Sequence, residues 1–160
     1  MTRTHAEKNA IIEIAEKAKE GLNKAFRALR KQGFIARQNY SCCRGCAGNE
    51  IANQVTAKID AGKLKDTFKG AVFTTRQDQM FEESRYGSLT IHKVYLAYGP
   101  VDTAKHGEQG VSTKEAGDLV VAALKEAGVS FEWDGDGDSC ILVNPCPGEW
   151  PEPGAHTLRV

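Results

Sequence analysis

Three segments with helical periodicity alternate with β-rich segments along the chain, and this order limits the folds that it can adopt. The helical segments cover 5–32, the stretch after the clustered cysteines up to Gly62, and 112–128. Apolar residues recur in each of them at steps of three and four. The last two β-rich segments face each other across the glycine-rich turn 134–139. We therefore predict an α+β fold, with a mixed sheet of about five strands, three main helices packed on it and a C-terminal β-hairpin.

The chain length fits a single α+β domain over residues 1–160. No internal repeat or linker divides it, and the first element is predicted to be an N-terminal helix at 5–32. The segment 77–87 is predicted to form one or two helical turns, and the polar stretch 100–112 is predicted to be a loop. Four of the five prolines fall in the last segment. We therefore expect an irregular C-terminal tail at 145–160.

The charge balance narrows the classes of partner. The chain carries 21 basic and 21 acidic residues, so its formal net charge is zero. Proteins that bind nucleic acid usually need a basic excess or a basic stripe to neutralise phosphates, and we expect no nucleic-acid partner. Charged residues interrupt the apolar positions near the N-terminus, which predicts neither a signal peptide nor a membrane span. We expect a cytoplasmic protein that binds a protein or a small molecule.

Three of the five cysteines fall in the stretch NYSCCRGCAGNE. Cys43 and Cys46 form a Cys-x-x-Cys pair, and Cys42 comes directly before it. Thiolates at this spacing can converge on one tetrahedral zinc ion, which takes about four nitrogen or sulfur ligands. Clustered cysteines in a reducing compartment indicate metal or free thiols before disulfides. The hypothesis is a structural zinc site with Cys43 and Cys46 as ligands, completed by Cys42, Cys140 or Cys146.

The same thiols fit two other interpretations. Where a strand leads into a helix, the helix N–H groups lower the pKa of the first thiol of a Cys-x-x-Cys pair. That arrangement is typical of thiol-disulfide redox proteins, and it would make Cys43 the nucleophile and Cys46 the resolving thiol. Alternatively, the three residues are small, soft side chains that pack the helix start against the sheet.

No complete catalytic signature occurs in the sequence. Gln77 and Asp78 form a polar pair at a strand end and are candidate functional residues, although Asp78 can equally cap a helix. Asp134 is a further candidate, in an acidic glycine-rich stretch that can equally be a simple turn. Of the four histidines, only His106 lies in a predicted loop from which it can ligate a metal. We expect a non-catalytic accessory or regulatory binding module with a structural cysteine cluster, and the alternative is a thiol-disulfide redox protein.

Several short motifs follow one another in a fixed order. They are a Tyr-x-Cys-Cys-x-x-Cys segment, a Gln-Asp pair, a Tyr-Gly that ends a long strand, an amphipathic helix with a terminal glycine, and a Trp-Asp-Gly turn. In this order the chain resembles, over residues 5–145, a bacterial and phage family of small cytosolic proteins known as a domain of unknown function. The resemblance implies a compact α+β domain without a specified activity. The motif positions that it carries over are Cys42, Cys43, Cys46, Gln77, Asp78, Trp133, Asp134 and Gly135.

That resemblance includes one departure. Relatives often have a histidine just before the Gln-Asp pair, where this chain has Thr74-Thr75-Arg76. If that histidine serves a metal site in relatives, Cys140 or Cys146 has to substitute for it here.

Overall fold

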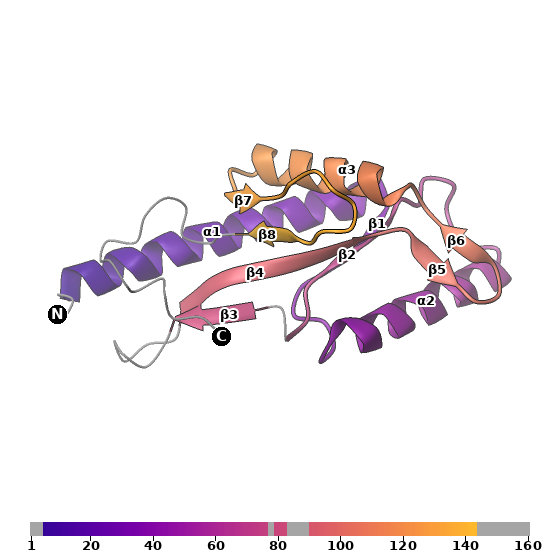
Figure 1. Ribbon diagram of the computed structural model, residues 1–160, viewed down its shortest axis with the longest axis horizontal. Coiled ribbons are helices and arrows are strands. Elements are labelled where there is room, and N and C mark those ends of the chain that lie inside the picture. Colours follow the sequence, from indigo (N-terminus) through magenta and orange to yellow (C-terminus); the bar gives the residue numbers. More distant parts are fainter. Residues whose placement is uncertain (1–4, 77–78, 83–89, 144–160) are drawn as a thin grey trace.

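The computed structural model describes residues 5–76, 79–82 and 90–143, which form three helices and eight strands (Figure 1). The helices are α1 (His5–Gln32), α2 (Arg44–Asp60) and α3 (Thr113–Glu126). The strands are β1 (Phe34–Arg37), β2 (Gly70–Phe73), β3 (Gln79–Glu82), β4 (Thr90–Gly99), β5 (Val101–Thr103), β6 (Gly107–Gln109), β7 (Phe131–Glu132) and β8 (Ile141–Val143).

The predicted cap residues set the ends of α2 and α3. Ser112 precedes α3 in an extended conformation, and its hydroxyl accepts a hydrogen bond from the Glu115 N–H at 3.2 Å. Gly62 and Gly128 follow the two helices with φ angles of 69° and 74°. These are left-handed conformations that glycine adopts without a steric penalty, and they end the helices where the sequence predicts.

Six strands form one mixed sheet in which β1, β2, β4, β8 and β7 are neighbours in that order, while β3 also pairs with β4. Strands β1 and β2 are parallel and are connected through α2, whereas the other pairs in this sheet are antiparallel. The longest strand, β4, is central, as predicted. The antiparallel pairing of β7 with β8 confirms the C-terminal hairpin.

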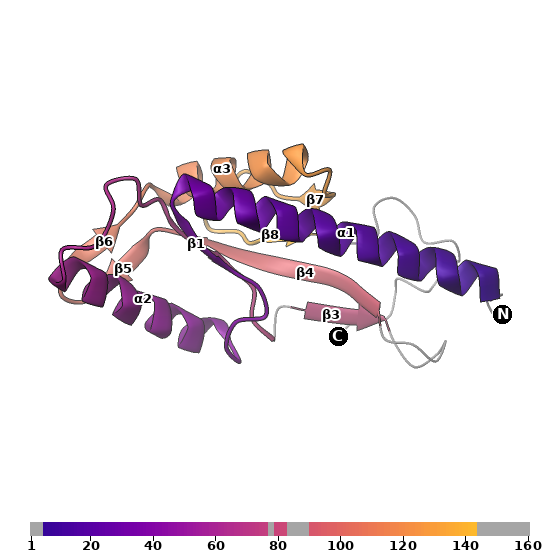
Figure 2. The same cartoon turned by 180° about the vertical axis from the view of Figure 1, so that it is seen from behind.

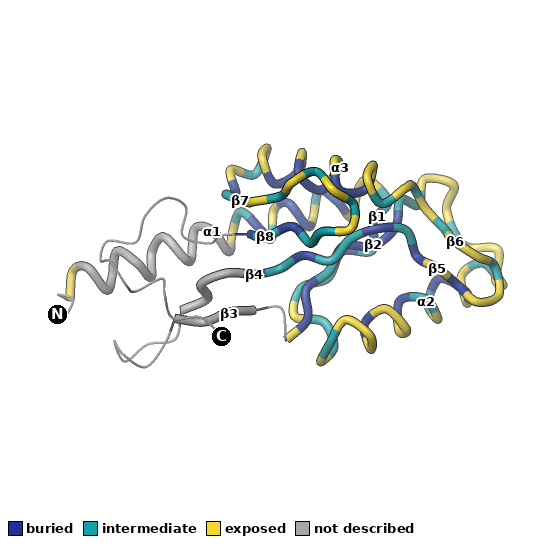
Figure 3. Tube along the Cα trace, viewed as in Figure 1, coloured by how far each residue is buried: buried dark blue, intermediate teal, exposed yellow. Residues whose placement is uncertain are grey.

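The helices cover both faces of the sheet, with α1 and α3 on one side and α2 on the other (Figures 1 and 2). Alternate residues of β2 face opposite sides, so that Val72 belongs to the core under α1 and α3 while Ala71 and Phe73 lie against α2. The core beneath α2 is the smaller one, built around Ile51 and Val55. The side of α2 that faces away from the sheet is exposed (Figure 3). The arrangement confirms the predicted α+β fold.

Two local predictions are wrong. Residues 79–82, predicted to be helical, form β3, because so short a stretch fits either period and pairing with β4 decides between them. The predicted loop 100–112 contains the hairpin of β5 and β6, in which β6 begins at Gly107 with a φ of 74°. The predicted irregular tail at 145–160 lies outside the described residues. Among the helices of the described residues, none has the length and apolar character that crossing a membrane requires.

Candidate metal centre

The three clustered cysteines lie where the chain passes from β1 into α2. Cys43 is the residue that precedes α2, in an extended conformation with φ −152° and ψ 169°, and its carbonyl accepts the first helical hydrogen bond from the Ala47 N–H at 3.0 Å. Cys42 comes one residue earlier, and Cys46 lies in the first turn of the helix. Residues three apart on a helix lie on the same side. The first turn of α2 therefore brings Cys46 back towards Cys43.

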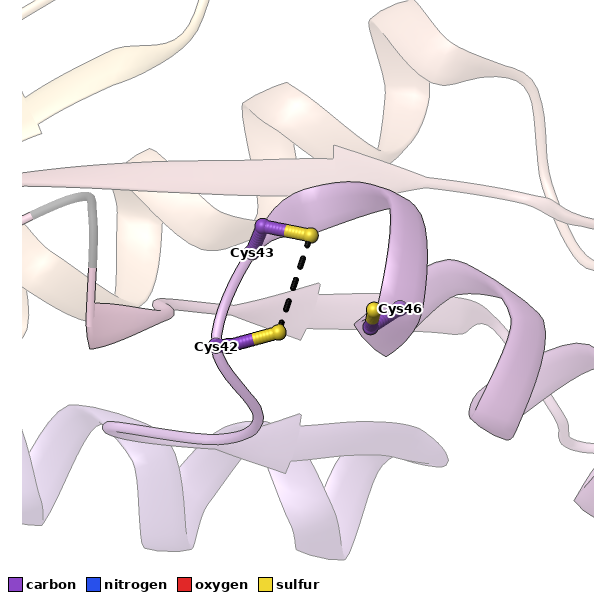
Figure 4. Close-up of side chains that lie close together, drawn as sticks. All are labelled: Cys42, Cys43 and Cys46. Atoms are coloured by element: carbon purple, nitrogen blue, oxygen red, sulfur yellow. Dashed lines mark hydrogen bonds between the residues drawn. The ribbon is translucent and has the colours of Figure 1, made fainter.

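The three sulfur atoms lie within 4.8 Å of one another (Figure 4). The Cys42 and Cys43 sulfurs are 3.9 Å apart. Four tetrahedral zinc–sulfur bonds of about 2.3 Å place neighbouring sulfurs about 3.8 Å apart, so small side-chain rotations would bring this group to metal-binding distances. Cys42 and Cys46 are exposed and Cys43 is half-buried. The group can hold a metal ion that arrives from solvent.

The start of α2 gives the thiols different acidities. The pKa of Cys43 is lowered, chiefly by the backbone N–H of Cys46 and then by the Cys46 and Cys42 thiols, although its side chain makes no full capping hydrogen bond. The pKa of Cys46 is raised to about 11 by the neighbouring Cys42 and Cys43 sulfurs. One thiolate is thus favoured at the helix start, and a second negative charge beside it is disfavoured unless a cation replaces the protons.

This difference predicts an order of alkylation in the metal-free protein. Iodoacetamide reacts with thiolates, so we expect Cys43 to be modified at lower pH than Cys46. Because Cys43 is one of the groups that raise the pKa of Cys46, we expect Cys43→Ser to shift the Cys46 profile to lower pH. Mass spectrometry of peptides labelled across a pH series measures both effects. Equal profiles for the two residues would contradict the assigned electrostatics.

The segment between β1 and α2 is a loop that carries Cys42 and Cys43. Tyr40, the first residue of the cysteine motif, attaches this loop to α2. Its hydroxyl accepts a hydrogen bond from the Gln54 side-chain amide at 3.1 Å. The Arg37 guanidinium lies 4.8 Å from the centre of the Tyr40 ring and also donates to the Gln54 side-chain oxygen at 2.9 Å. Arg37 and Gln54 were not among the predicted site residues, because their roles follow only from the packing of α2 beside the loop.

The backbone of the loop is also hydrogen bonded to the segment after β2. The Tyr40 N–H donates to the Thr74 carbonyl at 2.8 Å, and the Arg76 N–H donates to the Ser41 carbonyl at 3.3 Å. The parallel pairing of β1 with β2 therefore continues, in irregular form, up to the cysteines. The triplet Thr74-Thr75-Arg76 therefore lies beside the residues that lead into the cluster.

Among the described residues, none of the other predicted metal ligands lies with the three clustered cysteines. Cys140 is half-buried just before β8 and is not a member of the group that can hold a metal. Cys146 lies outside the described residues, as do Gln77 and Asp78. His106 lies at the far end of α2, where its Nε2 is 2.8 Å from the Asp60 carboxylate. Because the 17 residues of α2 span about 25 Å, His106 is too distant to join the cysteines.

The Trp-Asp-Gly motif forms a turn packed on α3, which covers the opposite face of the sheet from α2. The Trp133 indole N–H donates to the Tyr98 hydroxyl at 2.8 Å, and the two rings meet edge to face with centres 5.9 Å apart. The Asp134 carboxylate accepts the Asp136 N–H at 2.8 Å, and Gly135 has a φ of 83°. In these positions Trp133 and Asp134 stabilise the hairpin turn, and the motif is not part of the cysteine cluster.

The family described as a domain of unknown function, DUF6891, matches residues 13–151 of the chain. The match includes every element from α2 to β8 and all five cysteines. No curated protein matches the chain, and no solved structure does.

Proposed function

Because this chain belongs to the DUF6891 family, a domain of unknown function, we propose its role from its own chemistry: a non-catalytic binding module whose cysteine cluster holds one zinc ion. Cys42, Cys43 and Cys46 are the proposed ligands. The observation that carries the proposal is the approach of their three sulfurs to within 4.8 Å of one another at the start of α2.

The surroundings of the cluster favour bound thiolates. The N-terminal end of a helix carries partial positive charge, which stabilises negative groups. The first turn of α2 contains no acidic residue, so ionised cysteines are the negative groups available there. Soft thiolate ligands select thiophilic ions such as zinc over magnesium or calcium. Reduced thiols are needed for this chemistry, and we propose the cytoplasm as the compartment.

Three thiolates leave one position of a tetrahedral zinc ion for another ligand. Within residues 5–76, 79–82 and 90–143, no histidine or carboxylate joins the cysteine group. The fourth ligand in the proposal is Cys146, water, or a donor group of a bound protein or small molecule. The last of these would make the ion the point at which a partner attaches, which fits an accessory or regulatory role.

Zinc titration of the reduced, metal-free protein tests the proposal. We expect one equivalent to bind, the three thiols to become unreactive towards a thiol reagent, and the thermal midpoint of unfolding to rise. At a zinc concentration a hundred times the dissociation constant, binding to the native state alone adds about 2.7 kcal/mol, equivalent to up to about 10 °C for a chain of this size. Absence of stoichiometric binding would overturn the proposal.

One observation favours the redox alternative, namely the lowered pKa of Cys43 beside the raised pKa of Cys46. In that function a disulfide of a partner accepts two electrons and two protons and becomes two thiols, while Cys43 and Cys46 lose them and become joined. The redox function requires a metal-free native protein with a reversible disulfide. A metal analysis of the native protein together with a count of its free thiols separates the two functions.

A further inference from the structure

We infer that Thr74 is a positioning residue of the cysteine site, an inference that rests on the proposed zinc-binding function. Thr74 comes directly after β2, and 1% of its surface is exposed. Its side-chain hydroxyl accepts a hydrogen bond from the Asn39 N–H at 2.8 Å. Asn39 precedes the first cysteine of the cluster by three positions. The hydroxyl therefore acts on the loop that carries the sulfurs, although it does not touch them.

The loop needs such an anchor because its backbone is in an unfavourable conformation. Asn39 and Ser41 have φ angles of 49° and 65°. Residues other than glycine rarely adopt this left-handed region, and they stay in it only where the surroundings hold them there. Asparagine tolerates it better than serine does. The bond from Asn39 to Thr74 holds the first of these two residues, and the Arg76 N–H holds the carbonyl of the second.

The backbone of Thr74 completes the attachment. Its N–H donates to the Arg37 carbonyl at 3.0 Å, and its carbonyl accepts the Tyr40 N–H at 2.8 Å. Thr74 thus forms backbone hydrogen bonds to residues on both sides of Asn39, the first of the two left-handed residues. Asn39 itself is exposed, so without the hydroxyl its N–H can bond to water or to another acceptor if the loop moves. Such a movement would separate the sulfurs.

Substitution of Thr74 by valine tests this role, because valine keeps the shape of the side chain and lacks the hydroxyl. Groups that orient metal ligands typically contribute about 10- to 100-fold to metal affinity, and we expect Thr74→Val to weaken zinc binding within this range. Thr74→Ser keeps the hydroxyl and should bind zinc as the wild type does. Competition with a chromophoric chelator measures the dissociation constants of folded protein.

Thr103 supplies a matched control. It is also buried, with 2% of its surface exposed, and its hydroxyl accepts the His106 N–H at 3.0 Å in the turn between β5 and β6. Thr103→Val should lower thermal stability much as Thr74→Val does but leave zinc affinity unchanged. Equal zinc affinity of wild type and Thr74→Val would overturn the inference and leave the proposed function standing.

One further measurement does not depend on zinc binding. In the wild type, the Asn39 amide should be protected from hydrogen exchange, and this protection tests the anchor without any substitution and even if the protein binds no zinc. Exchange of the Asn39 amide at the rate of an unstructured peptide would overturn it.

Discussion

Replacement of Cys43 by serine is expected to abolish tight zinc binding while leaving the metal-free protein as stable as the wild type or more so. A serine hydroxyl does not replace a thiolate as a zinc ligand. Loss of groups that only orient ligands costs about 10- to 100-fold in affinity, so loss of a ligand should cost at least about a hundredfold. Serine is, however, among the best residues at the position before a helix. Cys43 makes no side-chain capping hydrogen bond there, and serine can gain one.

The two effects therefore have opposite signs, which distinguishes a lost ligand from a damaged fold. A chelator competition assay measures affinity, and urea unfolding without metal measures stability, with an expected gain of up to about 1 kcal/mol. Cys46→Ser should show the same loss of zinc affinity. Cys140→Ser, at a cysteine outside the group, should bind zinc normally. Wild-type affinity in Cys43→Ser would remove that residue from the proposed ligand set.

Gly117→Ala is expected to destabilise the protein, although alanine is the better helix former. Gly117 is buried in α3, and a Cβ atom added there would lie 2.5 Å and 2.7 Å from two ring carbons of Trp133. The Trp133 ring is held by its hydrogen bond to the Tyr98 hydroxyl and cannot move away freely. Forcing extra atoms into such contacts costs about 1–3 kcal/mol, whereas the gain in helix propensity is about 1 kcal/mol. We expect a net loss of up to about 2 kcal/mol.

Gly48→Ala is the matched control for that prediction. Gly48 is an exposed position of α2, and an added Cβ atom would meet nothing within 4 Å. There only the helix propensity changes, so we expect a gain of up to about 1 kcal/mol. Urea unfolding of both variants measures the two free energies. Equal stabilisation by the two alanines would mean that the Trp133 ring moves to make room for the added methyl group, and that the Trp-Asp-Gly turn does not fix its position.

Regular patterns made the main elements predictable from the sequence. The apolar periodicity of α3, the Ser112 cap and Gly128 defined that helix at both ends, and the long β-rich run defined β4. Strand β3 was not predictable in the same way, because four residues do not distinguish the two periods and its conformation depends on pairing with β4. The β5–β6 hairpin was missed because its two strands have only three residues each.

The clustering of Cys42, Cys43 and Cys46 was predictable for a different reason, since these residues are neighbours in the chain. The groups that hold their loop were not predictable, because Thr74 is 35 positions from the backbone amide it binds and reaches it only through the register of β1 against β2. The distant position of His106 was likewise invisible, because a loop residue has no periodicity to indicate where it lies.

All three sulfurs come from five consecutive positions of the chain. The entropy lost on closing a loop grows with the logarithm of its length, so bringing these thiols together costs little chain entropy, even before Thr74 anchors their loop. An unfolded chain accordingly keeps part of the capacity for chelation, which reduces the stabilisation of the native state by zinc below the value for native binding alone. In the proposed function, a nascent chain would be able to bind an ion once residue 46 has left the ribosome, before β2 has emerged. The ion would then act as a template for the first turn of α2.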